Sequence, residues 1–246
     1  MSKQNIYDNV TFFDSYSALR KEESNFNVLL EQPAMMKLLP DVSGKKVLDL
    51  GCGFGDNCID FIKKGATSVV GVDISEKMLT VAKTENSHSN IQYINISMTE
   101  IDALDTDFDL VYSSLAFHYI EDFNDLITKI YDRLSCNGVL LFSQEHPFIT
   151  ATIDGKGHFN KDENGVPISY TFSNYCQSGK RTSSWFVDGV EKYHRTMGET
   201  LTTIADVGFT IEKVVEPIPD DNALKIRPSL KKELLKPNFL LIKAKK

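Results

Sequence analysis

The sequence predicts an α/β fold with a doubly wound, mostly parallel seven-stranded sheet whose last strand is antiparallel. Three observations support this fold class. Strand-like and helix-like segments alternate from about residue 45 to residue 145, which is typical of parallel strands joined by crossover helices. The first strand-like segment runs into a glycine-rich loop. The alternation stops near residue 147 and resumes near residue 196, so a segment of another kind is expected between the two parts.

Each element is predicted from a local signal. The strands are expected in the apolar segments 47–50, 68–73, 91–95, 108–114, 139–145, 209–215 and 238–244. The helices between them are expected at 57–64, 75–85, 122–134 and 196–207. Capping side chains or terminal glycines mark their ends, namely Ser75, Asp122, the Thr196–Glu199 capping box, Gly65 and Gly208. Asn137-Gly138 predicts a turn into the fifth strand, and the approach after Pro237 favours an antiparallel edge strand at the end.

Three regions are expected along the chain. Residues 1–40 are predicted to form an N-terminal helical cap, in which Pro33 suits the start of a helix and both Met35 and Met36 belong to the core. Residues 41–146 and 193–246 are predicted to form the α/β core. Residues 147–192 are predicted to form a hairpin-rich insertion, because this segment holds two turn signals, Asn164-Gly165 and Asp188-Gly189. Its six aromatic residues either close over a site as a lid or form a small core of their own: Phe159, Tyr170, Phe172, Tyr175, Trp185 and Phe186.

Charge and composition exclude several classes of protein. The 34 acidic and 27 basic residues give a net charge of −7, which argues against nucleic acid as a partner. The stretch 223–246 holds eight basic residues and one acid, and we interpret it as a solvated rim. No apolar run approaches the roughly 20 residues that cross a membrane. The cysteines Cys52, Cys58, Cys136 and Cys176 lack metal-binding spacing and are interpreted as free thiols in the cytoplasm. The sequence therefore predicts a cytoplasmic protein without metal and leaves the oligomeric state open.

The loop after the first strand carries the main chemical signal. Gly51, Gly53 and Gly55 alternate with other residues there, and such glycines let a backbone approach a ligand closely. A dinucleotide fingerprint would need glycine at position 56, where the sequence has Asp56. Asp49 and Asp56 flank the loop and would repel a pyrophosphate, whereas they would attract an ammonium group and a positive centre. S-adenosylmethionine carries both.

The second strand ends in an acid that agrees with this cofactor. Asp73 follows Gly51 by 22 residues, and an acid at about this distance can accept both hydrogens of a ribose diol. The alternative is a side chain that caps the next helix, but Ser75 already suits that role.

Three segments together resemble a known family. VLDLGCGFG (47–55), VVGVDISEKML (69–79) and FDLVYSSLAFHYIEDF (108–123) are similar to the class I S-adenosylmethionine-dependent methyltransferases, within them to the type 11-like group that methylates small molecules. The resemblance implies a Rossmann-like methyltransferase fold. It also implies S-adenosylmethionine as methyl donor, S-adenosylhomocysteine as product and in-line transfer to an O, N or C atom of a small acceptor. It covers residues 45–145 strongly and 196–246 more loosely, and it specifies the cofactor but no substrate.

The resemblance also implies a set of cofactor contacts. Backbone atoms would line the methionine part, one acid would lie near its ammonium, another would hold the ribose, and apolar side chains would cover the adenine. The corresponding residues are Asp49, Gly51, Cys52, Gly53, Asp73, Ile74, Met78, Ser97, Met98, Ser113, Ser114 and Leu115. Ser97-Met98 departs from the acid-containing pair that is common in the family, so Glu100 or Asp102 is an alternative adenine contact.

Candidates for the acceptor side are less sharply defined. His118 is the candidate general base, with packing beside the cofactor as the alternative. His146, at the end of the fifth strand, is a second catalytic candidate. Arg195 could bind an anionic substrate or form a structural ion pair. Tyr16 and Trp185 are candidate substrate contacts in a lid.

Two other functions stay open at this point. A nicotinamide-dependent oxidoreductase could use the same architecture, although Asp56 and the flanking carboxylates argue against it. A protein that binds S-adenosylmethionine without catalysis is the other alternative. Nucleic acid as acceptor is disfavoured further, because the sequence holds no Asn/Asp-Pro-Pro-Tyr/Phe motif.

Overall fold

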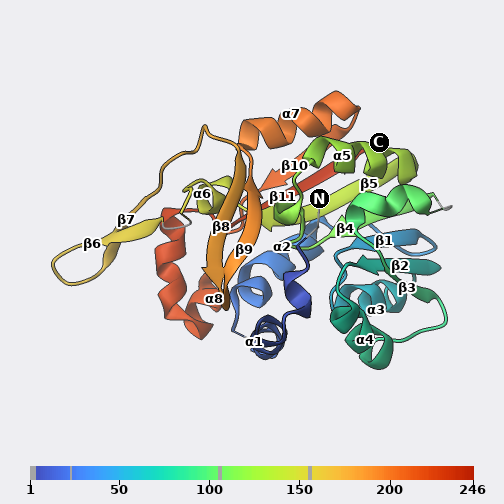
Figure 1. The fold of residues 1–246 in the computed structure, drawn as a ribbon, viewed down its shortest axis with the longest axis horizontal. Coiled ribbons are helices and arrows are strands. Elements are labelled where there is room, and N and C mark those ends of the chain that lie inside the picture. The colour runs from blue at the N-terminus through green and yellow to red at the C-terminus, as the bar shows by residue number, and fades with distance from the viewer. Residues whose placement is uncertain (1–3, 23, 105–106, 155–156) are drawn as a thin grey trace.

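The computed structural model describes residues 4–22, 24–104, 107–154 and 157–246 and contains one large sheet (Figure 1). Its seven strands lie in the order β10-β11-β5-β4-β1-β2-β3. Their bounds are β1 Lys46–Leu50, β2 Ser68–Asp73, β3 Ile91–Asn95, β4 Phe108–Ser113, β5 Leu134–Glu145, β10 Thr210–Val215 and β11 Phe239–Lys245. The pairs within β1 to β5 are parallel, and β11 is antiparallel to both of its neighbours. The predicted fold class is confirmed.

Two predictions about the sheet were wrong. The last strand is not at an edge, because β11 lies between β5 and β10, and β10 forms the edge. The residues explain this order: β11 is apolar and almost entirely buried, whereas β10 carries charged, exposed side chains.

The second wrong prediction concerns Asn137-Gly138, which does not form a turn between a helix and a new strand. β5 runs unbroken from Leu134, and Asn137, with φ of 65°, is accommodated where the pairing with β4 shifts register.

The helices cover both faces of the sheet (Figure 1). Their bounds are α1 Val10–Arg20, α2 Gln32–Leu38, α3 Asp56–Lys63, α4 Glu76–Glu85, α5 Phe123–Arg133, α6 Pro147–Thr150, α7 Met197–Val207 and α8 Asp221–Ile226. A π-helical turn, η2 Asn27–Glu31, and four 3₁₀ segments complete the set: η1 Ile6–Asp8, η3 Met98–Ala103, η4 Phe117–Tyr119 and η5 Pro228–Leu235. The predicted caps Ser75, Asp122 and Thr196 each accept the expected backbone N–H.

Two apolar clusters hold these layers together. On one face, Ile127 of α5 and Ile204 of α7 pack over Val111 of β4. On the other, Met35 of α2 and Phe61 of α3 pack over the same sheet, joined by residues of α8 and η5. Met36 is 38% exposed, so its predicted place in the core was wrong, because a helix that lies on a sheet buries only one side.

Two hairpins follow β5. The first consists of β6 His158–Lys161 and β7 Pro167–Thr171 and turns at the predicted Asn164-Gly165. The second consists of β8 Gly179–Trp185 and β9 Val187–His194. Its predicted turn at Asp188-Gly189 was wrong, because the chain reverses at Phe186, which has φ of 60°. The Phe186 ring packs on Phe12, with ring centroids 5.5 Å apart, and local turn chemistry does not encode such a tertiary contact.

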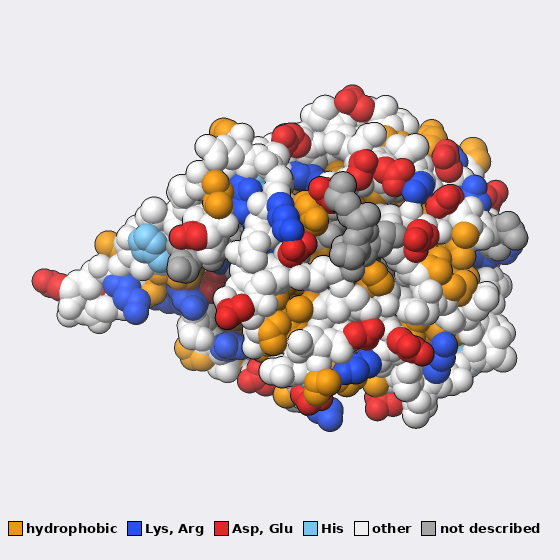
Figure 2. Space-filling view, viewed as in Figure 1, with side chains coloured by type: hydrophobic (Ala, Val, Ile, Leu, Met, Phe, Trp, Pro, Cys, Tyr) orange, Lys and Arg blue, Asp and Glu red, His pale blue; other side chains and the backbone are white. Residues whose placement is uncertain are grey.

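The molecular surface carries mixed charge. Figure 2 shows acidic and basic side chains interspersed over the body, with basic side chains gathered on the projecting β6–β7 end. The basic stretch near the C-terminus is partly interior, since the Lys236 ammonium donates to the buried Glu233 carboxylate at 2.8 Å. Within the described ranges, no helix is both long enough and apolar enough to cross a membrane.

Candidate functional site

The carboxyl ends of β1, β2 and β4 meet where the strand order reverses between β1 and β4. The loop after β1 requires its glycines: Gly51, Gly53 and Gly55 have φ of 72°, 55° and 78°. A Cβ atom on Gly51 would lie 2.8 Å from the Cβ of Ala116, whereas one on Gly53 would meet nothing within 4 Å. The loop is therefore tightly packed at Gly51 and presents open backbone at Gly53.

Asp49 lies beneath this loop as a buried carboxylate, 1% exposed. Its Oδ2 accepts a hydrogen bond from the Cys58 thiol at 3.4 Å, and its Oδ1 has no partner in the described part of the chain. Burial raises the pKa of Asp49 to about 7, and the nearby Asp73 and Asp56 act in the same direction. A cationic ligand group would satisfy the unpartnered oxygen and favour the ionised form.

Asp73 ends β2 on the other side of the loop. Its Oδ2 accepts the Gly53 N–H at 2.9 Å, and its Oδ1 accepts the Ser75 N–H at 2.8 Å. Burial raises the pKa of Asp73 to about 6, although these two N–H groups oppose the shift. Each carboxylate oxygen is thereby fixed in place and retains lone-pair capacity for a ligand hydroxyl.

The predicted adenine contacts follow β2 and β3. Met78 is buried in α4, and the Met98 methyl group lies 3.3 Å from the position that a Gly51 Cβ would take. Ser97 and Glu100 form a capping box at the start of η3, so both side chains already hold backbone N–H groups. The carbonyl of Ile74 accepts hydrogen bonds from the Asn5 and Asn95 side chains.

The exit of β4 is held rigidly. The Ser113 hydroxyl donates to the Leu50 carbonyl at 2.7 Å and so ties β4 to β1. Leu115 has φ of 53°, which is unusual for a residue with a side chain, and its N–H donates to the Ser143 hydroxyl of β5 at 3.0 Å. Strained backbone of this kind gathers at functional sites.

No pattern in the sequence predicted the contacts of residues 4–8. The Ser75 hydroxyl donates to Asp8 at 2.6 Å, directly beside Asp73. Gln4 donates to the Gly189 carbonyl at 2.7 Å and accepts the Glu191 N–H at 2.8 Å. Residues 4–8 therefore bridge the start of α4 and strand β9, and we call this segment the strap.

Aromatic side chains from four regions meet around Tyr7 of the strap: the N-terminal segment, the glycine loop, η4 and the β8–β9 hairpin. We call this cluster the aromatic cover; it consists of Tyr7, Phe12, Phe13, Tyr16, Phe54, Tyr119, Trp185 and Phe186. Tyr16 links the regions, since its ring centroid lies 6.0 Å from that of Phe54 in the glycine loop and 6.1 Å from that of Trp185. The other four aromatic residues of the insertion pack with one another and with Phe148. The insertion thus contributes both to the cover and to a small core of its own.

His118 lies behind the cover and is 4% exposed. Its Nδ1 accepts the Glu145 N–H at 3.3 Å, and its ring centroid lies 4.3 Å from that of Tyr119. Burial lowers the pKa of His118 to about 4, so the ring is neutral near pH 7. Because Nδ1 is the acceptor in this bond, the single proton of the neutral ring belongs on Nε2.

The other two polar candidates have partners elsewhere. His146 Nε2 lies 2.8 Å from the Glu216 carboxylate, and its Nδ1 accepts the Phe148 N–H at 3.1 Å, so both ring nitrogens are engaged. Arg195 donates to the Glu121 carbonyl at 3.1 Å and stacks over the Phe123 ring at 4.9 Å. The structure brings Tyr16 and Trp185 together, whereas His146 and Arg195 share no partner with them among the contacts described.

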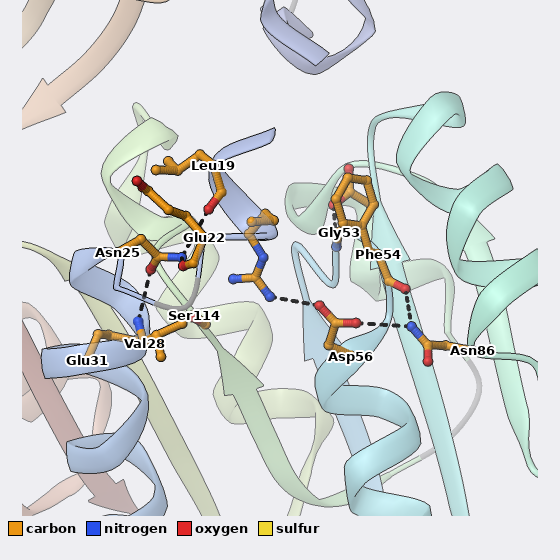
Figure 3. A network of polar contacts seen from close by, with 12 residues as sticks. Leu19, Glu22, Asn25, Val28, Glu31, Gly53, Phe54, Asp56, Asn86 and Ser114 are labelled. Atoms are coloured by element: carbon orange, nitrogen blue, oxygen red, sulfur yellow. Dashed lines mark hydrogen bonds and ion pairs between the residues drawn. The ribbon is translucent and has the colours of Figure 1, made fainter. Parts of the chain in front are cut away.

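Two charged residues near the loop were missed by the sequence reasoning. The Arg20 guanidinium of α1 pairs with Asp56 at 2.7 Å, and Figure 3 shows the Asp56 carboxylate also joined to Asn86. Glu31 of η2 is fully buried and accepts hydrogen bonds from Ser114 and Ser143. A carboxylate within the apolar run NVLLEQPAMM was the available signal.

The comparisons with known proteins agree with this geometry. A family model described as a methyltransferase domain matches residues 47–138. The chain is 36% identical to an uncharacterized protein of Haemophilus influenzae, with 100% of this chain and 98% of that protein covered. It is 38% identical to an S-adenosylmethionine-dependent methyltransferase from Mesorhizobium loti, at a TM-score of 0.82, with 93% of this chain and 100% of the other covered. A structure from Listeria monocytogenes, provisionally assigned to the same class, is 39% identical to this chain at a TM-score of 0.80. The match covers 88% of this chain and 96% of the other.

Proposed function

Because the chain belongs to the class I S-adenosylmethionine-dependent methyltransferases and transfers a methyl group from that cofactor, we propose that its acceptor is a small molecule, methylated at an O, N or C atom. The family assignment favours this function over a nicotinamide-dependent oxidoreductase and over a binding protein without catalysis. The observation that carries the small-molecule proposal is the aromatic cover, which joins the glycine loop, α1 and the β8–β9 hairpin through Phe54, Tyr16 and Trp185. An aromatic cover of this kind suits a small acceptor better than a long polymer.

The residues of the loop fit the cofactor. We propose that the unpartnered Asp49 Oδ1 serves the ammonium end, that the open backbone at Gly53 faces the methionine part and that Asp73 binds the ribose hydroxyls. Arg20, close to the loop, is the cation available for the methionine carboxylate. For the remaining predicted cofactor contacts, we propose the roles that the family resemblance implies. These residues are Gly51, Cys52, Ile74, Met78, Ser97, Met98, Ser113 and Leu115.

The bound cofactor supplies an electrophilic methyl group on a sulfonium that is already a good leaving group. The protein therefore contributes mainly by alignment of the acceptor and exclusion of water. We propose that the hydrogen-bonded segment after β4, from Ser113 to Leu115, holds the methionine part of the cofactor in place. The aromatic cover, with Tyr16 and Trp185, is proposed to exclude water. Arg195 and His146 are proposed to position neighbouring backbone, in keeping with their existing partners.

His118 is proposed to donate a hydrogen bond to acceptor or cofactor through Nε2 and not to act as the base. A general base contributes about 100-fold to 10,000-fold to rate, whereas a lost hydrogen bond costs about 0.5 to 1.5 kcal/mol. We therefore expect His118→Ala to lower kcat/KM by no more than about tenfold. Steady-state kinetics on any acceptor found will check this, and a loss of 100-fold or more would restore the base assignment.

The proposed function is tested by calorimetric titration of S-adenosylmethionine and S-adenosylhomocysteine, followed by a methyl-transfer assay. We expect binding of both in the micromolar range and transfer to at least one small phenol, amine, thiol or carboxylate. Transfer only to RNA or protein substrates would overturn the small-molecule proposal.

We also propose that the protein acts in the cytoplasm. The support is the state of its cysteines, since Cys52, Cys58, Cys136 and Cys176 are all unpaired and two of them are exposed thiols. Labelling of both exposed thiols in protein taken directly from cells will check this location.

A further inference from the structure

Glu31 is a buried carboxylate that makes no contact with the glycine loop among the hydrogen bonds described, and it lies on the N-terminal side of the site. Glu31 ends the π-helical turn η2 and is 0% exposed. Its Oε1 accepts hydrogen bonds from Ser114 at 2.8 Å and from Ser143 at 2.5 Å. Its Oε2 is buried and has no hydrogen-bond partner among the residues described. π-helical turns are frequent at functional sites, and an unpartnered buried carboxylate oxygen points to a missing donor.

Glu31 lies beside the end of β4, where the methionine side of the cofactor is proposed to bind. Ser114 directly follows β4, next to the strained Leu115, and Ser143 belongs to β5. Ser143 and Glu145 are two residues apart on β5, so their side chains share one face of the sheet. Glu145 also has a buried, unpartnered Oε2, while its Oε1 accepts the Lys192 ammonium at 2.5 Å. Two carboxylates, each with an unused oxygen, thus approach the same face of β5.

The surroundings of this face are aromatic. Tyr16 of the aromatic cover lies within electrostatic reach of both Arg20 and Glu31, and Trp185 packs against it. Figure 3 shows Glu31 and Ser114 on one side of the site, with Gly53, Phe54 and Asp56 on the other. Carboxylates combined with aromatic faces are the chemistry that binds organic cations.

The charges on this face are not balanced. Lys192 pairs with Glu145 and Arg20 pairs with Asp56, whereas Glu31 has no ion pair within the described residues. Burial raises the pKa of Glu31, with the Ser143 and Ser114 hydroxyls and Arg20 in opposition. A buried carboxylate without a cation is costly, so a positively charged ligand would stabilise it strongly.

We propose that Glu31 binds the amino group of the acceptor and that the acceptor is a small amine, methylated on nitrogen. This inference rests on the proposed function and narrows it. The bound ammonium gives one proton to the Glu31 carboxylate, and the freed nitrogen lone pair attacks the methyl carbon. The new N–C bond forms as the C–S bond breaks, and the C–S electron pair stays on sulfur as S-adenosylhomocysteine. Glu31 is thus a catalytic residue, because it contacts the reacting nitrogen.

The test uses pairs of compounds that differ only at the nucleophile. Tritium transfer from S-adenosylmethionine is measured with 2-phenylethylamine against 2-phenylethanol, and with histamine against 4-(2-hydroxyethyl)imidazole. Thermal stability of the protein loaded with S-adenosylhomocysteine is measured with the same four compounds. We expect the amines to stabilise the protein and to be methylated, and the alcohols to do neither.

Variants then assign the effect to the carboxylate. Glu31→Gln keeps the hydrogen-bond acceptor for Ser114 and Ser143 but removes the charge, and we expect a loss of at least 100-fold in kcat/KM for the amine. Binding of S-adenosylhomocysteine should stay within about twofold of the wild-type value. Glu22→Gln is the matched control, because Glu22 is exposed and joins the nearby network through its backbone, which the substitution leaves unchanged. Glu31→Asp, which keeps the charge, should retain part of the amine-dependent stabilisation.

Each contrary outcome overturns the inference in a recognisable way. Three results would contradict an amine acceptor bound by Glu31. They are an equal response to amines and alcohols, no response to any amine, and full activity of Glu31→Gln. An equal loss of S-adenosylhomocysteine binding and of activity in Glu31→Gln would assign the carboxylate to the cofactor. Failure of the proposed function itself is distinct, since the wild-type protein would then methylate only macromolecules.

Discussion

Asp49→Asn is expected to stabilise the cofactor-free protein at pH 8 by roughly 2 to 4 kcal/mol and to weaken cofactor binding. The folded protein raises the pKa of Asp49 from 3.8 to about 7, so above pH 7 the wild-type protein holds an ionised, buried carboxylate at a cost. That cost disappears as pH falls from about 7 towards 4, because the folded state takes up the proton first. The advantage of the variant should therefore be largest at pH 8 and small near pH 4.

Thermal unfolding with and without S-adenosylhomocysteine will check this prediction. For a chain of this size, the stabilisation corresponds to a rise in Tm of roughly 4 to 16 °C at pH 8. Saturating ligand should raise the Tm of the wild-type protein by more than that of the variant. Asp60→Asn is the matched control, since Asp60 lies on α3 with its side chain 47% exposed. A variant less stable than the wild-type protein at pH 8 would contradict the role of the unpartnered Oδ1.

Asp73→Ala is expected to weaken binding of S-adenosylmethionine by roughly 10-fold to 150-fold. The basis is the loss of charged hydrogen bonds to the ribose, worth about 1.5 to 3 kcal/mol. The variant also leaves the Gly53 and Ser75 N–H groups without their carboxylate, which loosens the loop. Calorimetric titration of both cofactor forms measures the effect directly.

Two further variants separate these contributions. Asp73→Asn keeps an acceptor for one backbone N–H, so it should recover part of the loop order but not the charged contact. Asp206→Ala, on the exposed side of α7, removes an acid far along the sequence and should bind as the wild-type protein does. Unchanged affinity in Asp73→Ala would remove Asp73 from the ribose site.

The parts of the fold that follow local rules were predictable from the sequence. Strand periodicity, the side chains at Ser75 and Asp122, and glycine after β1 each act within a few residues. The position of β11 inside the sheet agrees with its apolar side chains on both faces, and the edge prediction failed because it was based on the proline before the strand. The turn at Phe186 failed for another reason, since a distant ring packs on it and no local pattern encodes that contact.

The candidate site shows the same division. The proposed cofactor residues Asp49, Gly53 and Asp73 lie in one contiguous motif and at one strand end, so charge, family resemblance and spacing predict them from the sequence. Glu31 and Arg20 come from helical segments before β1, and only packing brings them to the ends of β4 and α3. The tautomer of His118 depends on a backbone N–H 27 residues away, which no motif records.

The strap has a consequence for the timing of turnover. Its contacts with α4 and β9 are side-chain hydrogen bonds through Gln4 and Asp8. Tyr7 adds ring contacts within the aromatic cover, but no residue of the strap belongs to the two apolar clusters. Release of such a segment needs far less free energy than unfolding of the sheet. We expect the spent cofactor to leave through this local opening, which would then limit kcat. Substitutions in the sheet interior would shift Tm and leave the product residence time unchanged, whereas a change at Gln4 would do the reverse.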